Sequence, residues 1–228
     1  MPDLDWVFLD AGNTLVLLDF ERVAEVLHRE FGFRGDPAAM DAAEPLARTH
    51  VDGPRLDGDF ERERWMTYFW TVLSAAGWTD RDRIPAALKA LFSQNRTFTL
   101  WSRPVRAAAA TLDRLRDQGY RLAVISNSDG SVEAMLERLG MKSRLEFVID
   151  SKVVGVEKPD PRIFRMALER SGADPGRSIY VGDMFHIDVL GARGVGMDAV
   201  LLDPGQHHEK RDCRRVREFA DLPEHLSR

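Results

Sequence analysis

The chain has 228 residues, 44% of them hydrophobic, which fits one α/β domain carrying a sizeable insertion or two small domains. Its net charge of −5 excludes a general electrostatic attraction to nucleic acid. The sequence holds one cysteine, Cys213, and no apolar run long enough to span a bilayer, so we expect a cytoplasmic protein without membrane contact. The arginine-rich run over 211–217 is offset by neighbouring acids and is interpreted as a solvated helix face.

Short, unbroken apolar runs predict the strands of a parallel sheet. Continuous runs, unlike alternating ones, are typical of strands that are buried on both faces. Such runs cover 6–9, 122–125 and 178–181, with weaker examples at 147–149 and 199–202. Helical patterns over 105–118, 131–139 and 161–171 separate them. Strands that alternate with helices predict a doubly wound, Rossmann-like parallel sheet.

Residues 17–98 break this alternation, because they contain no convincing buried strand. Three apolar stripes at helical spacing begin near Val23, Trp65 and Ile84, and Asp36-Pro37 is typical of a helix start. We therefore predict two domains, a core made of 1–16 and 99–228 and a helical insertion over 17–98.

Polar residues follow three of the predicted strands. They are Asp10, Ser126 with Asn127, and Asp183, and Lys158 lies between the second and the third. In open α/β sheets, ligands bind beyond the carboxyl ends of the strands. Any one of these residues could be a helix cap or a turn residue, but their combination predicts a functional site.

Four segments of this sequence, in order, resemble the motifs of the haloacid dehalogenase-like hydrolases. The segments are Asp10-Ala11-Gly12-Asn13-Thr14-Leu15, Ser126-Asn127, Lys158-Pro159-Asp160-Pro161 and Gly182-Asp183-Met184-Phe185-His186-Ile187-Asp188. The resemblance covers nearly the whole chain, and the helical insertion stands where the family carries its first type of cap domain. It implies a hydrolase that acts on a small phosphorylated metabolite, as a monomer or a homodimer.

The resemblance also implies a role for each motif residue. Asp10 would attack the substrate, and Mg²⁺ would be held by Asp10, the carbonyl of Gly12 and Asp183, with Asp188 as a further ligand or as a support for the others. Ser126 and the amide of Asn127 would bind a phosphoryl oxygen at a helix N-terminus, where the helix dipole favours an anion. Lys158 would neutralise charge on the nucleophile and the phosphoryl group, and Thr14 would fix the loop and bond the nucleophile or phosphate.

The first motif departs from the pattern of the family's phosphatases at Gly12. Those enzymes usually carry an aspartate there, which protonates the leaving alcohol. Glycine cannot transfer a proton, and general acid–base catalysis contributes roughly 10²–10⁴-fold. We therefore expect alkyl phosphates to be poor substrates, whereas the metal-binding role of the main-chain carbonyl is retained.

The sequence leaves three other interpretations open. The first is a carbon-attacking, dehalogenase-like enzyme, although Gly182-Asp183 resembles the phosphatases better than that branch. The second is a phosphonoacetaldehyde hydrolase, which needs a cap lysine, and the insertion offers only Lys89, near its end. The third is a catalytically weak member that binds a phosphorylated metabolite or a partner protein.

Two features of the insertion bear on specificity. The aromatic-rich segment 65–70 is interpreted mainly as the core of the cap, with one or two side chains available for a substrate. Arg55, in a glycine-containing loop, is a candidate for recognising an anionic group.

Overall fold

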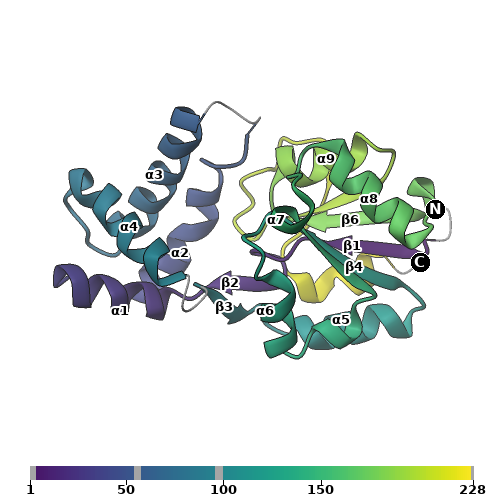
Figure 1. The fold of residues 1–228 in the computed structure, drawn as a ribbon, viewed down its shortest axis with the longest axis horizontal. Helices are drawn as coiled ribbons and strands as arrows, with labels where there is room; N and C mark the ends of the chain where they lie inside the picture. The colour runs from purple at the N-terminus through teal and green to yellow at the C-terminus, as the bar shows by residue number, and fades with distance from the viewer. Residues whose placement is uncertain (1–3, 54–57, 96–99, 227–228) are drawn as a thin grey trace. The chain divides into compact units, whose positions relative to one another are not determined.

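The computed structural model describes residues 4–53, 58–95 and 100–226, drawn in Figure 1. The chain divides into two compact units, one made of Met1–Leu17 with Arg103–Arg228 and the other of Leu18–Ser102. Strands β2 (Val16–Leu18) and β3 (Trp101–Pro104) form a two-stranded sheet, and each contains one of the two unit boundaries. Both crossings of the chain between the units therefore lie in this pair of strands.

The first unit is built on a six-stranded sheet with the order β5-β4-β1-β6-β7-β8, in which every neighbouring pair is parallel. Its strands are β1 (Trp6–Leu9), β4 (Arg121–Ser126), β5 (Phe147–Asp150), β6 (Ser178–Gly182), β7 (Asp198–Leu202) and β8 (Arg214–Val216). β1 lies between β4 and β6, and all of its residues are buried, as the unbroken apolar run predicts.

Helices lie on both faces of this sheet (Figure 1), which confirms the predicted doubly wound architecture. They are α5 (Ala108–Asp117), α6 (Val132–Arg138), α7 (Ser151–Val154), α8 (Pro161–Ser171), α9 (Leu190–Arg193) and α10 (Leu222–Leu226). Short turns of helix are η2 (Lys142–Arg144), η3 (Pro175–Arg177), η4 (Phe185–Val189) and η5 (Phe219–Asp221). One face packs Trp6, Phe8 and Tyr180 against Phe164 of α8, so that a single apolar core joins the sheet to this layer.

Local sequence explains where α8 begins and ends. The Asp160 side chain accepts a hydrogen bond from the backbone N–H of Arg162, and Pro161 occupies the first turn, where its missing N–H costs nothing. Gly172 ends the helix in the left-handed region, with φ 66. The prediction of a helix over 161–171 is confirmed.

The second unit is helical and consists of α1 (Phe20–Phe31), α2 (Pro37–Arg48), α3 (Gly58–Ala75), η1 (Arg81–Arg83) and α4 (Ile84–Asn95). The Asp36 side chain caps α2 as predicted, by accepting from the N–H of Ala38. In the aromatic segment, Tyr68 and Phe69 are buried, whereas Trp65 is half-buried. Arg55 lies outside the described residues.

The arginine-rich run over 211–217 is not a helix, so that prediction was wrong. Residues Arg214–Val216 form β8, the strand that ends the sheet beside β7. The prediction failed because this edge strand has three residues, two of them charged, and therefore shows neither strand nor helix periodicity. In the part of the chain that the structure describes, no helix combines the length and apolarity needed to cross a bilayer.

Candidate active site

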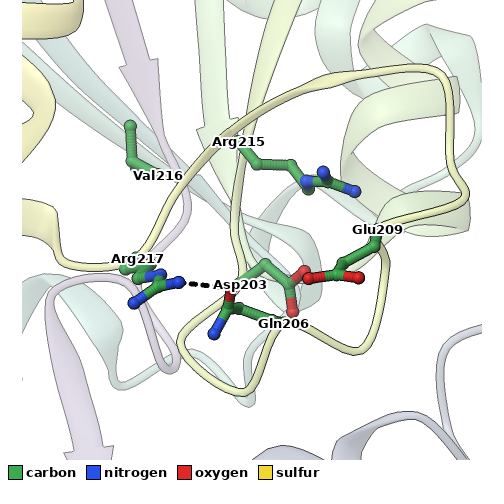
Figure 2. Close-up of a pocket in the computed structure, with 6 residues that line it drawn as sticks. All are labelled: Asp203, Gln206, Glu209, Arg215, Val216 and Arg217. Carbon is green, nitrogen blue, oxygen red and sulfur yellow. Dashed lines mark hydrogen bonds between the residues drawn. The ribbon is translucent and has the colours of Figure 1, made fainter.

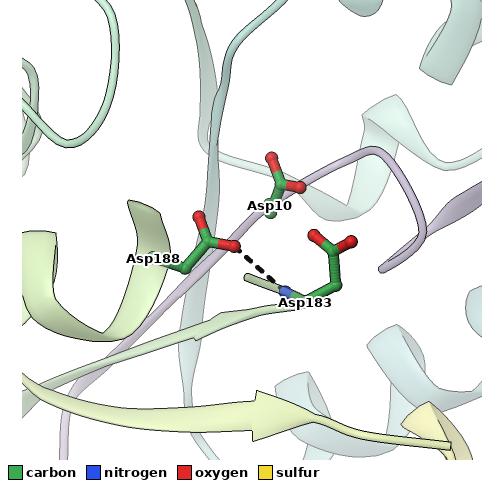
Figure 3. A group of neighbouring side chains, drawn as sticks. All are labelled: Asp10, Asp183 and Asp188. Carbon is green, nitrogen blue, oxygen red and sulfur yellow. Dashed lines mark hydrogen bonds between the residues drawn. The ribbon is translucent and has the colours of Figure 1, made fainter. Parts of the chain in front are cut away.

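Three aspartates come together at the carboxyl edge of the sheet (Figure 3). Asp10 follows β1 and Asp183 follows the neighbouring strand β6, while Asp188 comes from η4, five residues further along. All three side chains are buried, and each offers a carboxylate oxygen that lies within 4.8 Å of the other two. Sequence reasoning predicted all three residues, and the structure brings them into one cluster.

Lys158 supplies the positive charge of this cluster. Its Nζ donates to Oδ1 of Asp10 at 2.8 Å, to Oδ1 of Asp188 at 2.7 Å and to the hydroxyl of Tyr180 at 2.8 Å. The ammonium has three N–H groups, so each of them has one buried acceptor. The side chain is 2% exposed, and its position is therefore set by these oxygens rather than by water.

Asn127 lies against the backbone of Lys158. Its Oδ1 accepts from the N–H of Lys158 at 2.8 Å, and its Nδ2 donates to the carbonyl of Lys158 at 3.0 Å. This pair of bonds ties the loop after β4 to the loop that precedes α8. The side chain of Asn127 thus orients Lys158, while its backbone N–H remains at the strand end, beside Ser126.

Tyr180 is a site residue that sequence reasoning missed. It lies in β6, is fully buried, and donates its hydroxyl proton to the carbonyl of Ile125 at 2.8 Å while accepting from Lys158. The signal was present, because a tyrosine inside an otherwise apolar buried strand needs a hydrogen-bond partner for its hydroxyl.

Burial and neighbouring charges have opposite effects on the pKa values of Lys158 and Asp188 in this cluster. Burial alone would lower the pKa of Lys158, but the charges of Asp10 and Asp188 and the Tyr180 hydroxyl raise that pKa well above its usual value. Burial also raises the pKa of Asp188, against the opposing effect of Lys158. Three carboxylates and one ammonium leave a formal charge of −2, which a divalent cation would balance.

Both carboxylate oxygens of Asp188 are already engaged. Oδ1 accepts from Lys158, and Oδ2 accepts from the backbone N–H groups of Asp183 and Met184, each at 3.0 Å. Figure 3 shows the bond from Asp183. Gly182 makes this approach possible, since a Cβ at that position would lie 2.3 Å from Oδ2 of Asp188. Asp188 therefore braces the backbone beside Asp183.

The loop after β1 brings one further motif residue, Asn13, to the cluster. Asn13 adopts φ 52, a left-handed conformation that asparagine tolerates better than most residues, and its Nδ2 donates to Oδ2 of Asp183 at 3.2 Å. Thr14 is fully buried, and no described residue bonds its Oγ1. Gly12 pairs with Val16 in an isolated bridge. Sequence reasoning did not single out Asn13, because its contact depends on the loop conformation.

Ser126 is buried at the end of β4. α6 starts at Val132 with Ser131 at its N-cap position, as the helical pattern over 131–139 predicts, so a loop separates Asn127 from the helix. The intervening loop is held by Asp150, whose carboxylate accepts from the N–H groups of Gly130 and Val132. A phosphoryl oxygen at Ser126 would therefore meet the strand end and this loop, not the first turn of a helix.

A separate pocket lies beyond the end of β7, on the same unit. Its volume is about 190 Å³, and six residues line it (Figure 2): Asp203, Gln206, Glu209, Arg215, Val216 and Arg217. Asp203 follows β7 as Asp183 follows β6, so the pocket lies at the edge of the sheet that carries the aspartate cluster. Sequence reasoning did not anticipate it.

Comparison with known proteins places this architecture in a family. "Haloacid dehalogenase-like hydrolase domain-containing protein 3" of Bos taurus is 33% identical over 138 residues, which are 60% of this chain and 55% of that protein. The chain thus spans little more than half the length of this relative. A "Glyceraldehyde 3-phosphate phosphatase" of Methanothermobacter thermautotrophicus is 35% identical over 176 residues, 76% of each chain.

Solved structures agree on the fold. The crystal structure of the hydrolase YfnB of Bacillus subtilis, described as bound to magnesium, matches with a TM-score of 0.68 and 17% identity, over 99% of this chain and 100% of that one. The family model described as haloacid dehalogenase-like hydrolase matches residues 4–196, a range that includes the three aspartates and Lys158. The chain therefore belongs to the haloacid dehalogenase-like hydrolase family.

Proposed function

We propose that the protein is a Mg²⁺-dependent phosphohydrolase that acts on a small phosphorylated metabolite through an aspartyl-phosphate at Asp10. The observation that carries this proposal is the buried cluster of Asp10, Asp183 and Asp188 around Lys158. A relative that is 35% identical is named "Glyceraldehyde 3-phosphate phosphatase", which supports hydrolysis of a phosphorylated metabolite. That compound is an alkyl phosphate, whereas Gly12 in this chain favours phosphates with better leaving groups.

The residues of the cluster fit a magnesium ion. Mg²⁺ prefers oxygen ligands and is usually bound through one or two carboxylates with several waters. Asp10 and Asp183 are the proposed direct ligands, together with the carbonyl of Gly12. Asp188 is proposed to support them, because both of its oxygens accept hydrogen bonds within the protein. When bound, Mg²⁺ would offset the negative charge of the transferring phosphoryl group.

In the proposed reaction, a carboxylate oxygen of Asp10 forms a bond to phosphorus while the bond from phosphorus to the leaving oxygen breaks. A water molecule then attacks the phosphorus of the aspartyl-phosphate, which releases inorganic phosphate and restores the carboxylate. Lys158 holds Asp10 in place through its 2.8 Å hydrogen bond and offsets its charge. Ser126 and the N–H of Asn127 are the proposed contacts to a phosphoryl oxygen, and Thr14 is the proposed anchor of the nucleophile loop.

Gly12 decides which substrates suit this site. Since its position offers no proton donor, leaving groups that depart without protonation should react fastest. Acyl phosphates and aryl phosphates meet this condition, whereas alkyl phosphates need a proton from the substrate or from another residue. The domain assignment belongs to the same proposal, with Leu18–Ser102 acting as the cap that sets specificity.

The first experiment measures hydrolysis of acetyl phosphate, p-nitrophenyl phosphate and glycerol phosphate with and without Mg²⁺. We expect Mg²⁺-dependent turnover of the first two, little of the third, and loss of turnover in Asp10→Asn. Asp117→Asn, at an exposed helix end, serves as the control that should keep full activity. Bound Mg²⁺ without turnover of any phosphate would contradict the proposal and favour a binding protein or attack on carbon.

A further inference from the structure

The pocket beyond β7 is built by the connection that joins β7 to β8. The carboxylate of Asp203 is 5% exposed and accepts from the backbone N–H groups of His207 and His208, each at 3.0 Å. The imidazole Nδ1 of His208 lies 3.3 Å from the same carboxylate. These contacts fold the connection over the end of β7 and leave a cavity of about 190 Å³ (Figure 2). Part-buried polar contacts therefore hold the wall at Asp203, whereas Gln206, Glu209 and Arg217 are exposed.

Two arginines, Arg215 and Arg217, line this pocket. Arg215 donates to the carbonyl of His208, and Arg217 donates to the side-chain oxygen of Gln206. Neither forms an ion pair with any residue that the structure describes. A guanidinium carries five N–H donors, so each arginine keeps donors that can face the cavity.

The six lining residues include two arginines and two acids, Asp203 and Glu209. The segment 204–217 around them carries five basic and two acidic side chains within a protein of net charge −5. Of the two acids in the pocket, Asp203 is compensated by the N–H groups that it accepts. Glu209 is exposed, where solvent and salt screen its repulsion.

From these contacts we propose that the pocket is a second anion-binding site, in which Arg215 and Arg217 hold a phosphate, sulfate or carboxylate group. Guanidinium groups bind such oxyanions through charge-assisted, often bidentate hydrogen bonds. The guanidinium groups of Arg215 and Arg217 lie on different sides of the pocket (Figure 2). The volume lies below the roughly 300–1,000 Å³ of sites for drug-sized ligands, so the pocket suits one small anionic group.

The position of the pocket points to the substrate as one source of this group. Asp183 follows β6 and Asp203 follows β7, and neighbouring strands lie about 4.8 Å apart. A short metabolite with phosphate at one end and a second anionic group at the other could therefore span both sites. The idea that one substrate spans both sites rests on the proposed function, whereas the anion site itself does not. The pocket could equally take a separate small anion with the same oxyanion chemistry.

To test the site, we would measure the Kd of sulfate for the metal-free protein by titration calorimetry. Without metal, the aspartate cluster carries a formal charge of −2 and opposes anions, so sulfate binding reports on the pocket. We expect Arg215→Gln and Arg217→Gln each to weaken the sulfate Kd by about tenfold or more. Glu209→Gln should change the Kd in the opposite direction and tighten binding.

Arg214→Gln is the matched control for this experiment. Arg214 lies on the same strand and carries the same charge, but it pairs with Asp198 and with the carbonyl of His225. Its sulfate Kd should stay within about twofold of the wild-type value. Absence of sulfate binding to the wild type, or an equal loss in all three arginine variants, would overturn the proposal. Because Arg217 is exposed, Arg217→Gln should fold even if Arg215→Gln does not.

A second measurement distinguishes the two sources of the anion. Propyl phosphate and propanediol bisphosphate are compared as inhibitors of Mg²⁺-dependent acetyl phosphate hydrolysis. If the pocket takes the distal group of the substrate, the bisphosphate inhibits more strongly, and Arg217→Gln removes that advantage. If it takes a separate anion, the two inhibitors behave alike while sulfate still binds. If neither the wild type nor any variant hydrolyses acetyl phosphate but the wild type still binds sulfate, the proposed phosphohydrolase activity is contradicted. The proposed anion site is then still supported.

Discussion

Lys158 provides the positive charge and hydrogen bonds for two of the buried carboxylates of the site. Its three N–H groups are shared among Asp10, Asp188 and Tyr180, all of which are buried. Removing one partner of a buried ion pair leaves the other partner as an uncompensated charge, which costs about 3–5 kcal/mol. We therefore expect the same lysine to contribute both to folding of the first unit and to the proposed reactivity of Asp10.

Lys158→Met, which keeps the length of the side chain and removes its charge, should separate these contributions. We expect the free energy of unfolding to fall by about 3–5 kcal/mol without metal, because Asp10 and Asp188 lose their counter-charge. Mg²⁺ should restore part of this loss, while turnover stays at least about 100-fold below wild type. Urea denaturation with and without Mg²⁺, together with kinetics, measures both effects.

The control for this substitution is Lys152→Met, because Lys152 is exposed. Its unfolding free energy should change by less than about 0.5 kcal/mol. Wild-type stability of Lys158→Met in the absence of metal would show that Lys158 does not balance the buried carboxylates.

The sequence predicted some site residues and not others for a physical reason. Asp10, Lys158, Asp183 and Asp188 stand at fixed places after strands or within motifs, so spacing alone identifies them. Asn13 reaches Asp183 only because its backbone adopts φ 52, a property that the sequence pattern does not display.

Among the elements, the loop between β4 and α6 depends most on a single side chain. Asp150, the last residue of β5, accepts from the N–H groups of Gly130, Val132 and Lys152. A carboxylate that takes several backbone donors satisfies groups that the start of α6 would otherwise leave unpaired. β5 thus holds the segment that follows Ser126.

Asp150→Asn should loosen this loop, because it replaces one acceptor oxygen by an amide that faces backbone donors. We expect a loss of about 1–3 kcal/mol in unfolding free energy and faster hydrogen exchange at Gly130 and Val132. Urea denaturation and amide exchange measured by NMR check the two parts. Asp117→Asn is again the control, and equal exchange rates in all three proteins would refute the assigned role of Asp150.

Two elements show where sequence reasoning succeeds and where it fails. α8 is bounded by Asp160, Pro161 and Gly172, whose side chains and backbone preferences act locally, so its limits follow from sequence. β8 is a strand only because it pairs with β7. Partners distant in the chain decide such elements, and for that reason β8 and the pocket beside it could not be predicted.

At the scale of the molecule, exposed acids of the first unit respond to pH together. Hydrogen bonds from Arg177, Arg144 and Arg114 lower the pKa values of Asp5, Asp113 and Glu224, and the hydrogen bond from Arg162 lowers that of Asp160 to about 2. A carboxyl whose pKa is lower in the folded state stabilises the protein above its unfolded pKa, near about 4, and loses that effect as pH falls through the folded value.

We therefore expect the urea midpoint of the first unit to be steady above about pH 5 and to decline between about pH 4 and about pH 2. Added salt should make the decline smaller, since these pairs are exposed and screened. Urea titrations over this range at low and high NaCl measure both effects. A midpoint that stays constant down to about pH 2 would contradict the assigned pairs.

The central position of β1 has a consequence for how the protein is made. β1 is synthesised first of all the strands, yet its partners begin at Arg121 and Ser178. At roughly 5–20 residues per second, the ribosome delivers the second partner on the order of ten seconds or more after β1. The whole of Leu18–Ser102 emerges in the interval. The apolar Trp6–Leu9 segment has neither strand partner until Arg121–Ser126 has been synthesised and lacks the second until Ser178–Gly182 follows. We expect nascent chains to be most prone to aggregation and most dependent on chaperones in that period.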